Sequence, residues 1–396
     1  MRILFVSSSK YTHEGSSKAL MNLLNELVPF GVQPMIVLPR KDSLYTYLVG
    51  KGIKCIVLSQ PYRMSVYPIS QSIKEKLLFI PRLICKMIIN SLATIQLLKI
   101  IKDFRPNIIH SNDSGTAIGY YAARFLNLPH IRHIREYGAL NLHPYAYYPS
   151  FSHQKKRYKR KKSYTICITK DIQHYNSLFQ HPTSRVIYDG VLPSNSVFYS
   201  KLKKSYLLYA GRLETIKGIL PLIDAYAVYK SKTTSPLPLY IAGSGTDEYT
   251  QLVKNKIVQF ELTDNITLLG MRNDILSFYK EAKAFIVPSL SEGFGFITTE
   301  AMFSGCLVIG NNIAGTKEQF DNGKELTGEE IALRYNNQEE LVQHLIDITE
   351  KKIAFYEPMI LRGQRVVEQL YSTEKSAKQI LDFYNYILEQ ETTLSV

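Results

Sequence analysis

Short apolar segments alternate with longer, helix-like segments through most of this chain, and this alternation restricts the possible folds more than any other feature. The apolar segments are the length of buried strands, and the segments between them carry apolar residues at helical spacing. The predicted strands are residues 3–6, 35–38, 53–58, 108–110, 130–134, 165–168, 206–209, 239–242, 266–268, 284–287 and 307–309. Because the βαβα pattern occurs twice, it predicts an α/β protein with two doubly wound, Rossmann-like parallel sheets and ligands at the carboxyl ends of their strands.

The charge distribution also favours two domains. Residues 1–190 contain 27 Lys and Arg against 9 Asp and Glu, a net charge of +18, whereas residues 191–396 contain 21 against 25, a net charge of −4. Residues 193–205 are polar and turn-rich. We therefore predict an N-terminal domain over residues 1–192 and a second domain over residues 193–372.

The basic first half is expected to attract an anionic partner, which could be nucleic acid, a phospholipid surface or a phosphorylated substrate. Residues 155–162 contain seven cations in eight positions. This run predicts a solvated face, with contact to an anionic membrane surface as the alternative. Nucleic acid is not favoured, because only Tyr158 interrupts the run and no recognition motif accompanies it.

Residues 81–103 form the most apolar helix predicted in the basic half, with Pro81 suited to its first turn. We predict a core helix packed on the sheet; the alternative is a membrane-facing helix with Arg82 and Lys86 near anionic headgroups. No window reaches the roughly 20 uninterrupted apolar residues of a spanning helix, and no signal peptide is recognised. We expect a cytoplasmic protein, either free or peripheral at the inner face of the plasma membrane.

Residues 288–302 carry the strongest local signal. The strand predicted at 284–287 is followed by a loop with two glycines, and a helix is predicted to begin near Ile297 and to end at Gly305. A helix N-terminus of this kind offers free N–H groups and a partial positive charge to a phosphate, and glycine lets the backbone approach a ligand closely.

Two carboxylates belong to this segment, Glu292 in the loop and Glu300 in the first turns of the helix. Paired carboxylates can also form the acid and base of a hydrolase, and the sequence alone leaves that alternative open.

The segment resembles the retaining glycosyltransferases of family 4, which are of the group 1 type. Glu292 and Glu300 have that family's E-x(7)-E spacing within a segment similar to its P-S-x-x-E-G-F-G-x-x-x-x-E-A-M pattern. Four further segments are similar to the family's N-G-V, G-R-L-x-x-x-K-G, G-x-G and G-x-x-E elements: residues 189–191, with Asp189 in place of Asn, 209–218, 240–245 and 314–318. The resemblance covers the whole predicted second domain and, more loosely, the first.

The resemblance implies a GT-B fold, in which the two domains face a central cleft. The first domain would bind the acceptor, joined by a C-terminal helix over residues 373–396, and the second would bind the nucleotide-sugar donor. Carried over by position, Glu292 would orient the donor sugar and Glu300 would accept hydrogen bonds from the ribose. The residues then expected around the donor diphosphate are Arg212, Lys217, Gly15, Phe296 and Ile297, and those around the sugar and nucleotide are Gly211, Gly293, Phe294, Gly295 and Glu300.

No D-x-D motif occurs in the chain. We therefore expect no metal site, and no cofactor besides the nucleotide-diphosphate-sugar co-substrate. Protein cations would neutralise the leaving diphosphate.

The first domain departs from the family's pattern. The family commonly places a histidine after the strand found here at 130–134, and our matching puts Arg135 or Glu136 at that position. Glu136 is then expected to accept the acceptor's proton and Arg135 to bind an anionic group. His110 is a second catalytic candidate, with a purely structural histidine as the alternative. The family's glycine pair in the first loop is reduced here to Gly15.

The predicted function is transfer of a hexose-type sugar, with retention at the anomeric carbon, to a saccharide or polyprenyl-linked acceptor. Bacterial surface polysaccharide biosynthesis (capsule, O-antigen or exopolysaccharide) is the expected setting. Two alternatives stay open: a nucleotide-sugar epimerase or hydrolase of the same fold, and a catalytically silent nucleotide-sugar-binding partner subunit.

Overall fold

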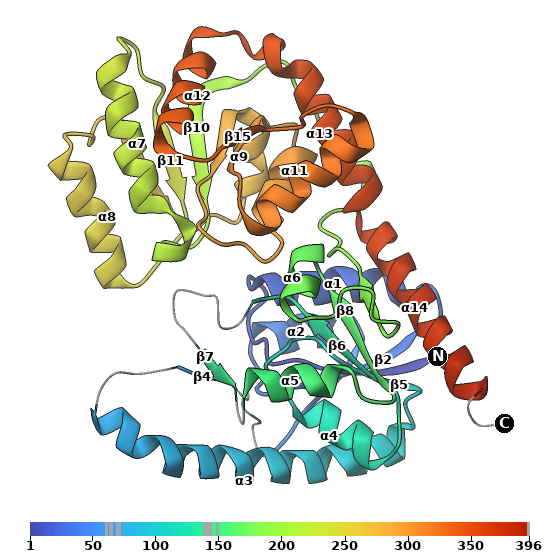
Figure 1. Ribbon diagram of the computed structural model, residues 1–396. Coiled ribbons are helices and arrows are strands. Elements are labelled where there is room, and N and C mark those ends of the chain that lie inside the picture. The colour runs from blue at the N-terminus through green and yellow to red at the C-terminus, as the bar shows by residue number, and fades with distance from the viewer. Residues whose placement is uncertain (60–61, 63–65, 69–72, 138–144, 148–149, 394–396) are drawn as a thin grey trace. The chain divides into compact units, whose positions relative to one another are not determined.

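The computed structural model describes residues 1–59, 62, 66–68, 73–137, 145–147 and 150–393, and it forms two compact units (Figure 1). The first unit comprises Met1–Gly190 and Thr373–Val396, and the second comprises Val191–Ser372. The boundary predicted from the sequence lies after residue 192.

The first unit is built on a seven-stranded parallel sheet in the order β3-β2-β1-β5-β6-β8-β9. Its strands are β1 (Arg2–Val6), β2 (Gln33–Leu38), β3 (Lys54–Val57), β5 (Ile108–Ser111), β6 (His130–Ile134), β8 (Ser163–Cys167) and β9 (Ser184–Val186). A separate antiparallel pair joins β4 (Val66–Pro68) to β7 (Tyr145–Tyr147). The helices of the first unit are α1 (Gly15–Leu27), α2 (Ser43–Gly50), α3 (Ile73–Phe104), α4 (Ile118–Phe125), α5 (Phe151–Tyr158), α6 (Lys170–Tyr175) and α14 (Thr373–Thr393).

Both faces of this sheet are covered, which explains why its strands β1 and β2 are apolar on both sides. Alternate residues of β1 enter different cores: Ile3 and Phe5 pack in one apolar cluster, and Leu4 and Val6 in another. The first cluster includes Ile380 and Tyr384 of α14. The last helix of the chain is therefore part of the core of the first unit.

The second unit is built on a six-stranded parallel sheet in the order β12-β11-β10-β13-β14-β15. Its strands are β10 (Lys204–Ala210), β11 (Leu239–Ala242), β12 (Ile266–Gly270), β13 (Ala282–Val287), β14 (Val308–Asn311) and β15 (Leu333–Tyr335). Its helices are α7 (Ile219–Lys232), α8 (Asp247–Gln259), α9 (Ile275–Glu281), α10 (Phe296–Phe303), α11 (Ala314–Thr327), α12 (Gln338–Glu350) and α13 (Glu357–Leu370), with 3-10 turns η1 (Ser194–Ser196), η2 (Thr215–Lys217) and η3 (Ile353–Tyr356). The predicted fold class, two Rossmann-like parallel-sheet domains, is confirmed.

Helix α3 differs from the prediction in two respects. It begins at Ile73, so Pro81 lies inside the helix instead of in its first turn. Pro81 is exposed, so water can bind the carbonyl that loses its N–H partner. The helix is also only partly a core helix. Ala93, Leu97 and Ile101 are buried in the core of the first unit. By length and composition, however, Leu77–Phe104 could cross a membrane, and only 17% of its most apolar window is buried.

Candidate functional site

The second unit places two loops side by side at the carboxyl edge of its sheet. Strands β10 and β13 are parallel neighbours, so the segments that follow them, residues 211–218 and 288–295, emerge at the same edge. The amide of Leu290 donates to the carbonyl of Ile216 at 2.8 Å and joins the two loops directly. Ligands of open α/β sheets bind at this edge.

A short ion pair links these loops. Lys217 Nζ lies 2.6 Å from Glu292 Oε2, and the two side chains are only 15% and 14% exposed. Arg212, by contrast, is 75% exposed and lies 3.0 Å from Glu214. The structure thus brings Lys217 and Glu292 together and leaves Arg212 on the solvent side of the same loop.

Helix α10 begins at Phe296 directly after this loop, as the sequence predicts within one residue. Gly295 has φ 95° and ψ 64°, in the left-handed region that favours glycine, and this turn carries the chain from the loop into the helix. Phe296 and Ile297, both half-buried, form the start of the helix. A Cβ atom on Gly295 would lie 3.2 Å from Glu292 Cγ, so the Glu292 side chain lies beside the residue that precedes α10. A helix N-terminus is a favourable place for an anion.

The loop is held from behind by helix α11. The amide of Gly315 donates to the carbonyl of Glu292 at 2.9 Å, and Gln319 Nε2 donates to the carbonyl of Phe294 at 2.7 Å. A Cβ atom on Gly315 would lie 2.8 Å from the carbonyl oxygens of Glu292 and Gly293, so glycine permits this close approach. These contacts fix Glu292 and Gly293 before any ligand binds.

Glu300 lies one turn into α10 and is 7% exposed. Burial raises the pKa of Tyr279 well above its ordinary value, and the charge of Glu300 raises it further. Glu300 is therefore a buried carboxylate of α10, whereas Glu292 belongs to the loop before the helix and is paired with Lys217.

Sequence reasoning missed four polar residues around this loop. The oxygens Ser289 Oγ, Thr298 Oγ1, Thr316 Oγ1 and Gln319 Oε1 are buried and have no hydrogen-bond partner among the described residues. Buried polar atoms are normally paired with protein, water or a ligand. Thr298 occupies an unspecified position of the E-x(7)-E motif and Gln319 follows the last motif element by one residue, so no motif draws attention to them.

The residues predicted around the acceptor lie in the first unit, and two of them, His110 and Arg135, belong to buried networks. His110 Nδ1 lies 2.6 Å from Tyr384 Oη, and its Nε2 lies 3.3 Å from His133 Nδ1. Arg135 donates to both carboxylate oxygens of Asp189, at 3.1 and 3.0 Å, and to the carbonyl and side-chain oxygens of Asn112. Both residues therefore connect parts of the first unit to one another.

Glu136 has a different environment. Ser114 Oγ donates to its Oε1 at 3.3 Å, and burial, followed by the charge of Asp113, raises the pKa of Glu136. A carboxylate with a raised pKa is a stronger base than an ordinary glutamate.

Gly15, the first residue of α1, has open space where a Cβ atom would be.

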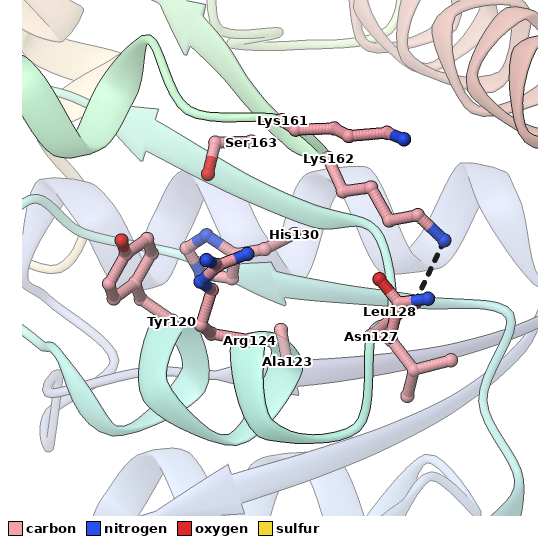
Figure 2. Close-up of a pocket in the computed structure, with 9 residues that line it drawn as sticks. All are labelled: Tyr120, Ala123, Arg124, Asn127, Leu128, His130, Lys161, Lys162 and Ser163. Atoms are coloured by element: carbon pink, nitrogen blue, oxygen red, sulfur yellow. Dashed lines mark hydrogen bonds between the residues drawn. The ribbon is translucent and has the colours of Figure 1, made fainter.

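The first unit has a small cavity at the amino edge of its sheet, where the strands begin (Figure 2). Its lining includes His130 and Ser163, the first residues of β6 and β8, together with Lys162, whose Nζ donates to the carbonyl of Asn127 at 3.0 Å. Its volume of about 30 Å³ suffices for roughly one water molecule. The cavity is therefore too small for a sugar nucleotide and lies at the amino edge, away from the edge that α/β sheets use for ligands.

The region that contains the two loops is similar to a known protein family. Residues 196–365, which contain both loops, match the family described as "Glycosyl transferases group 1". The chain is 25% identical to an uncharacterised glycosyltransferase, MJ1607, of Methanocaldococcus jannaschii, over 54% of this chain and 57% of that protein. It is 31% identical to the O-antigen chain mannosyltransferase RfbU of Salmonella typhimurium, over 35% of this chain and 38% of that protein. The chain thus spans about two fifths to three fifths of the length of these relatives.

Among solved structures, Anabaena Alr3699/HepE in complex with UDP is similar to 98% of this chain and to its own full length, with a TM-score of 0.76 and 17% identity. This likeness establishes the GT-B fold. Most of the second unit is thus similar to the group 1 glycosyltransferases, and the chain has the GT-B fold.

The buried histidines of the first unit predict how its stability depends on pH. Burial, followed by the charge of Arg135, lowers the pKa of His110 to about 3, and burial also lowers the pKa of His130 and His133. An unfolded histidine titrates near pH 6.5, so the unfolded chain binds more protons at lower pH. The contribution of these neutral histidines to the free energy of unfolding should be fully present above about pH 6.5. Below about pH 6.5 the free energy of unfolding should fall by up to about 1.4 kcal/mol per pH unit for each histidine.

Urea unfolding at pH 7.5, 6.0 and 5.0 measures this dependence. The His110→Gln variant should reduce the slope below pH 6.5, whereas His344→Gln in the second unit should leave the slope for the first unit unchanged. Equal slopes in the wild type and His110→Gln would contradict the prediction.

Proposed function

We propose that this protein is a glycosyltransferase that moves a sugar from a nucleotide-diphosphate-sugar to a saccharide or lipid-linked saccharide. The observation that carries the proposal is the Lys217–Glu292 pair, 2.6 Å apart at the carboxyl edge of the second sheet and next to the N-terminus of α10. A cation, a helix N-terminus and a carboxylate are the groups needed for a diphosphate joined to a sugar. The match of residues 196–365 to group 1 glycosyltransferases supports this choice.

In the proposed mechanism, Lys217 and the first N–H groups of α10 neutralise the negative charge that develops on the departing diphosphate. Such preorganised donors stabilise a transition state without reorganisation. Glu292, released from Lys217 by the incoming phosphate, orients the hydroxyl groups of the donor sugar. Arg212, exposed on the same loop, adds a second cation, and Glu300 binds the ribose.

We further propose that transfer proceeds with retention, without a metal ion, and that Glu136 accepts the proton of the acceptor. The raised pKa of Glu136 supports this role. Arg135 and His110 are proposed as positioning residues that do not touch the substrate. Their hydrogen bonds hold Asp189, Asn112 and Tyr384 in place.

The setting we propose is bacterial surface polysaccharide biosynthesis at the cytoplasmic face of an anionic membrane. The name of RfbU, an O-antigen chain mannosyltransferase, supports the pathway. The net charge of +18 over residues 1–190 supports the anionic surface. UDP bound in HepE favours uridine nucleotides as the first donors to test.

A thermal-shift screen with UDP, GDP and ADP and their sugars tests the proposal. A nucleotide at about 100 times its Kd should raise the melting temperature by several degrees, because it binds only the folded chain. Donor turnover should then require an acceptor, and proton NMR of the product should show the donor's anomeric configuration. No shift with any nucleotide, or full turnover of donor without acceptor, would contradict the proposal.

A further inference from the structure

The exposed face of α3 is apolar for about five helical turns. Seven of its large apolar residues are between 44% and 74% exposed. They are Leu77, Ile80, Ile84, Met87, Ile88, Leu92 and Ile95. Most of them follow one another at three- and four-residue intervals, so they lie on one side of the helix. Soluble proteins rarely expose a continuous apolar surface of this kind without a partner.

The opposite side of α3 is fixed in the first unit. Ala93, Leu97 and Ile101 are buried in the apolar cluster that also contains Leu4 and Val6 of the central strand β1. A helix that crossed a bilayer would have to leave this cluster. The geometry therefore favours a helix that lies along a membrane surface over one that spans it.

The charges on and beside α3 match an anionic surface. Residues 76–102 contain no Asp or Glu, and Arg82, Lys99 and Lys102 are exposed. Two copies of this face would place like charges together, which disfavours self-association through it. An acidic bilayer satisfies both the apolar residues and the cations.

The basic run at residues 155–162 adjoins the same layer of the unit. Helix α4 packs on α3 (Figure 1). Arg157, at the end of α5, lies over the Tyr121 ring of α4, 5.0 Å from its centroid. Lys156, Lys159, Arg160 and Lys161 of the run are exposed. Each cation near an anionic bilayer adds about 1 kcal/mol to binding.

We propose that α3 docks the first unit onto an anionic phospholipid bilayer, lying in the plane of the interface with Leu77–Ile95 inserted among the headgroups and upper acyl chains. The proposal rests on the proposed function only in taking a membrane as the site of the reaction. It assigns the surface, the orientation of the helix and the lipid class.

Vesicle flotation tests this proposal, with phosphatidylcholine alone or with 30 mol% phosphatidylglycerol. The wild type should bind the acidic vesicles at least tenfold more tightly than the neutral ones. The Ile84→Gln/Ile88→Gln variant should bind at least tenfold more weakly than the wild type. The matched control is Leu252→Gln/Val258→Gln, which changes two apolar residues of α8 that are 53% and 66% exposed, and it should bind as the wild type does.

A fluorophore on Cys85 gives an independent readout. Cys85 is the exposed cysteine, on α3 itself, whereas Cys167 and Cys306 are buried and Cys55 is partly buried. The emission of the fluorophore should shift to the blue when acidic vesicles are added. In a separate extraction, alkaline carbonate should release the protein from the vesicles, as expected for a helix that does not span the bilayer.

Three outcomes would overturn the proposal: no binding to acidic vesicles, equal binding by Ile84→Gln/Ile88→Gln, or retention after carbonate treatment, which indicates a spanning helix. A concentration-dependent dimer that this variant abolishes, without vesicle binding, would assign the face to a second copy. The nucleotide thermal shift is measured without lipid, so failure of docking and failure of the proposed function are distinguishable.

Discussion

Lys217→Ala is expected to lower kcat/KM for sugar transfer by about two to three orders of magnitude, the usual cost of removing one preorganised donor to a developing charge. Lys217 is held 2.6 Å from Glu292 and is 15% exposed, so its charge acts in a partly desolvated place. The variant should also lose nucleotide affinity, because the diphosphate loses a cation in the ground state. Steady-state kinetics and the thermal shift with nucleotide measure both effects.

Lys256→Ala is the matched control. Lys256 also forms a partly buried ion pair in the second unit, 2.8 Å from Asp224, but it lies on α8 away from the two loops. Its loss should leave kcat/KM within about twofold. Lys217→Arg keeps the charge and should recover part of the activity. Full activity in Lys217→Ala would show that Lys217 does not take part in binding the donor diphosphate.

Gly218→Ala should cause the second large effect, on the second unit's stability and nucleotide affinity together. Gly218 has φ +68°, and a Cβ atom there would lie 1.9 Å from the carbonyl oxygen of Pro288. The methyl group therefore forces apart the segments that carry Lys217 and Glu292. We expect a loss of about 3 kcal/mol or more in unfolding free energy and at least tenfold weaker nucleotide binding.

Gly270→Ala separates contact from backbone strain. Gly270 has nearly the same φ, +66°, but nothing lies within 4 Å of a Cβ atom there. The variant should lose only the roughly 1–2 kcal/mol of a left-handed alanine and should bind nucleotide normally. If calorimetry found the two variants equally affected, the contact with Pro288 would have no special role.

The central strands could be predicted from the sequence, because strands covered on both faces are continuously apolar. All eleven predicted strands are present. The edge strands β9 and β15 are absent from the prediction. Each has three residues with an arginine in the middle, as in Ser184–Val186 and Leu333–Tyr335, so neither offers an apolar run to recognise.

Helix α3 shows a different limit of sequence reasoning. Its apolar residues lie all round the helix, so the spacing of Ile84 and Leu97 does not tell which is buried. Only the fold decides, by packing Leu97 against the sheet and leaving Ile84 exposed.

The two loops of the candidate site could be predicted, because each follows an apolar strand and carries a motif. Their contact could not, because Lys217 and Glu292 are 75 residues apart and meet only through the pairing of β10 with β13. Thr298 Oγ1 and Gln319 Oε1 have no hydrogen-bond partner in the part of the chain that the structure describes, and this follows from their burial in the folded chain, which a motif does not encode.

The path of the chain has a practical consequence for engineering. Since α14 completes the core of the first unit, the whole second unit is an insertion between Gly190 and Thr373. An exchange of the second unit between related chains therefore needs two crossover points, one at each junction. A chimera with a single junction would combine the first unit with the C-terminal helix of another protein. Truncation after Ser372 would remove Ile380 and Tyr384 from a core that is otherwise built from N-terminal residues such as Ile3 and Phe5.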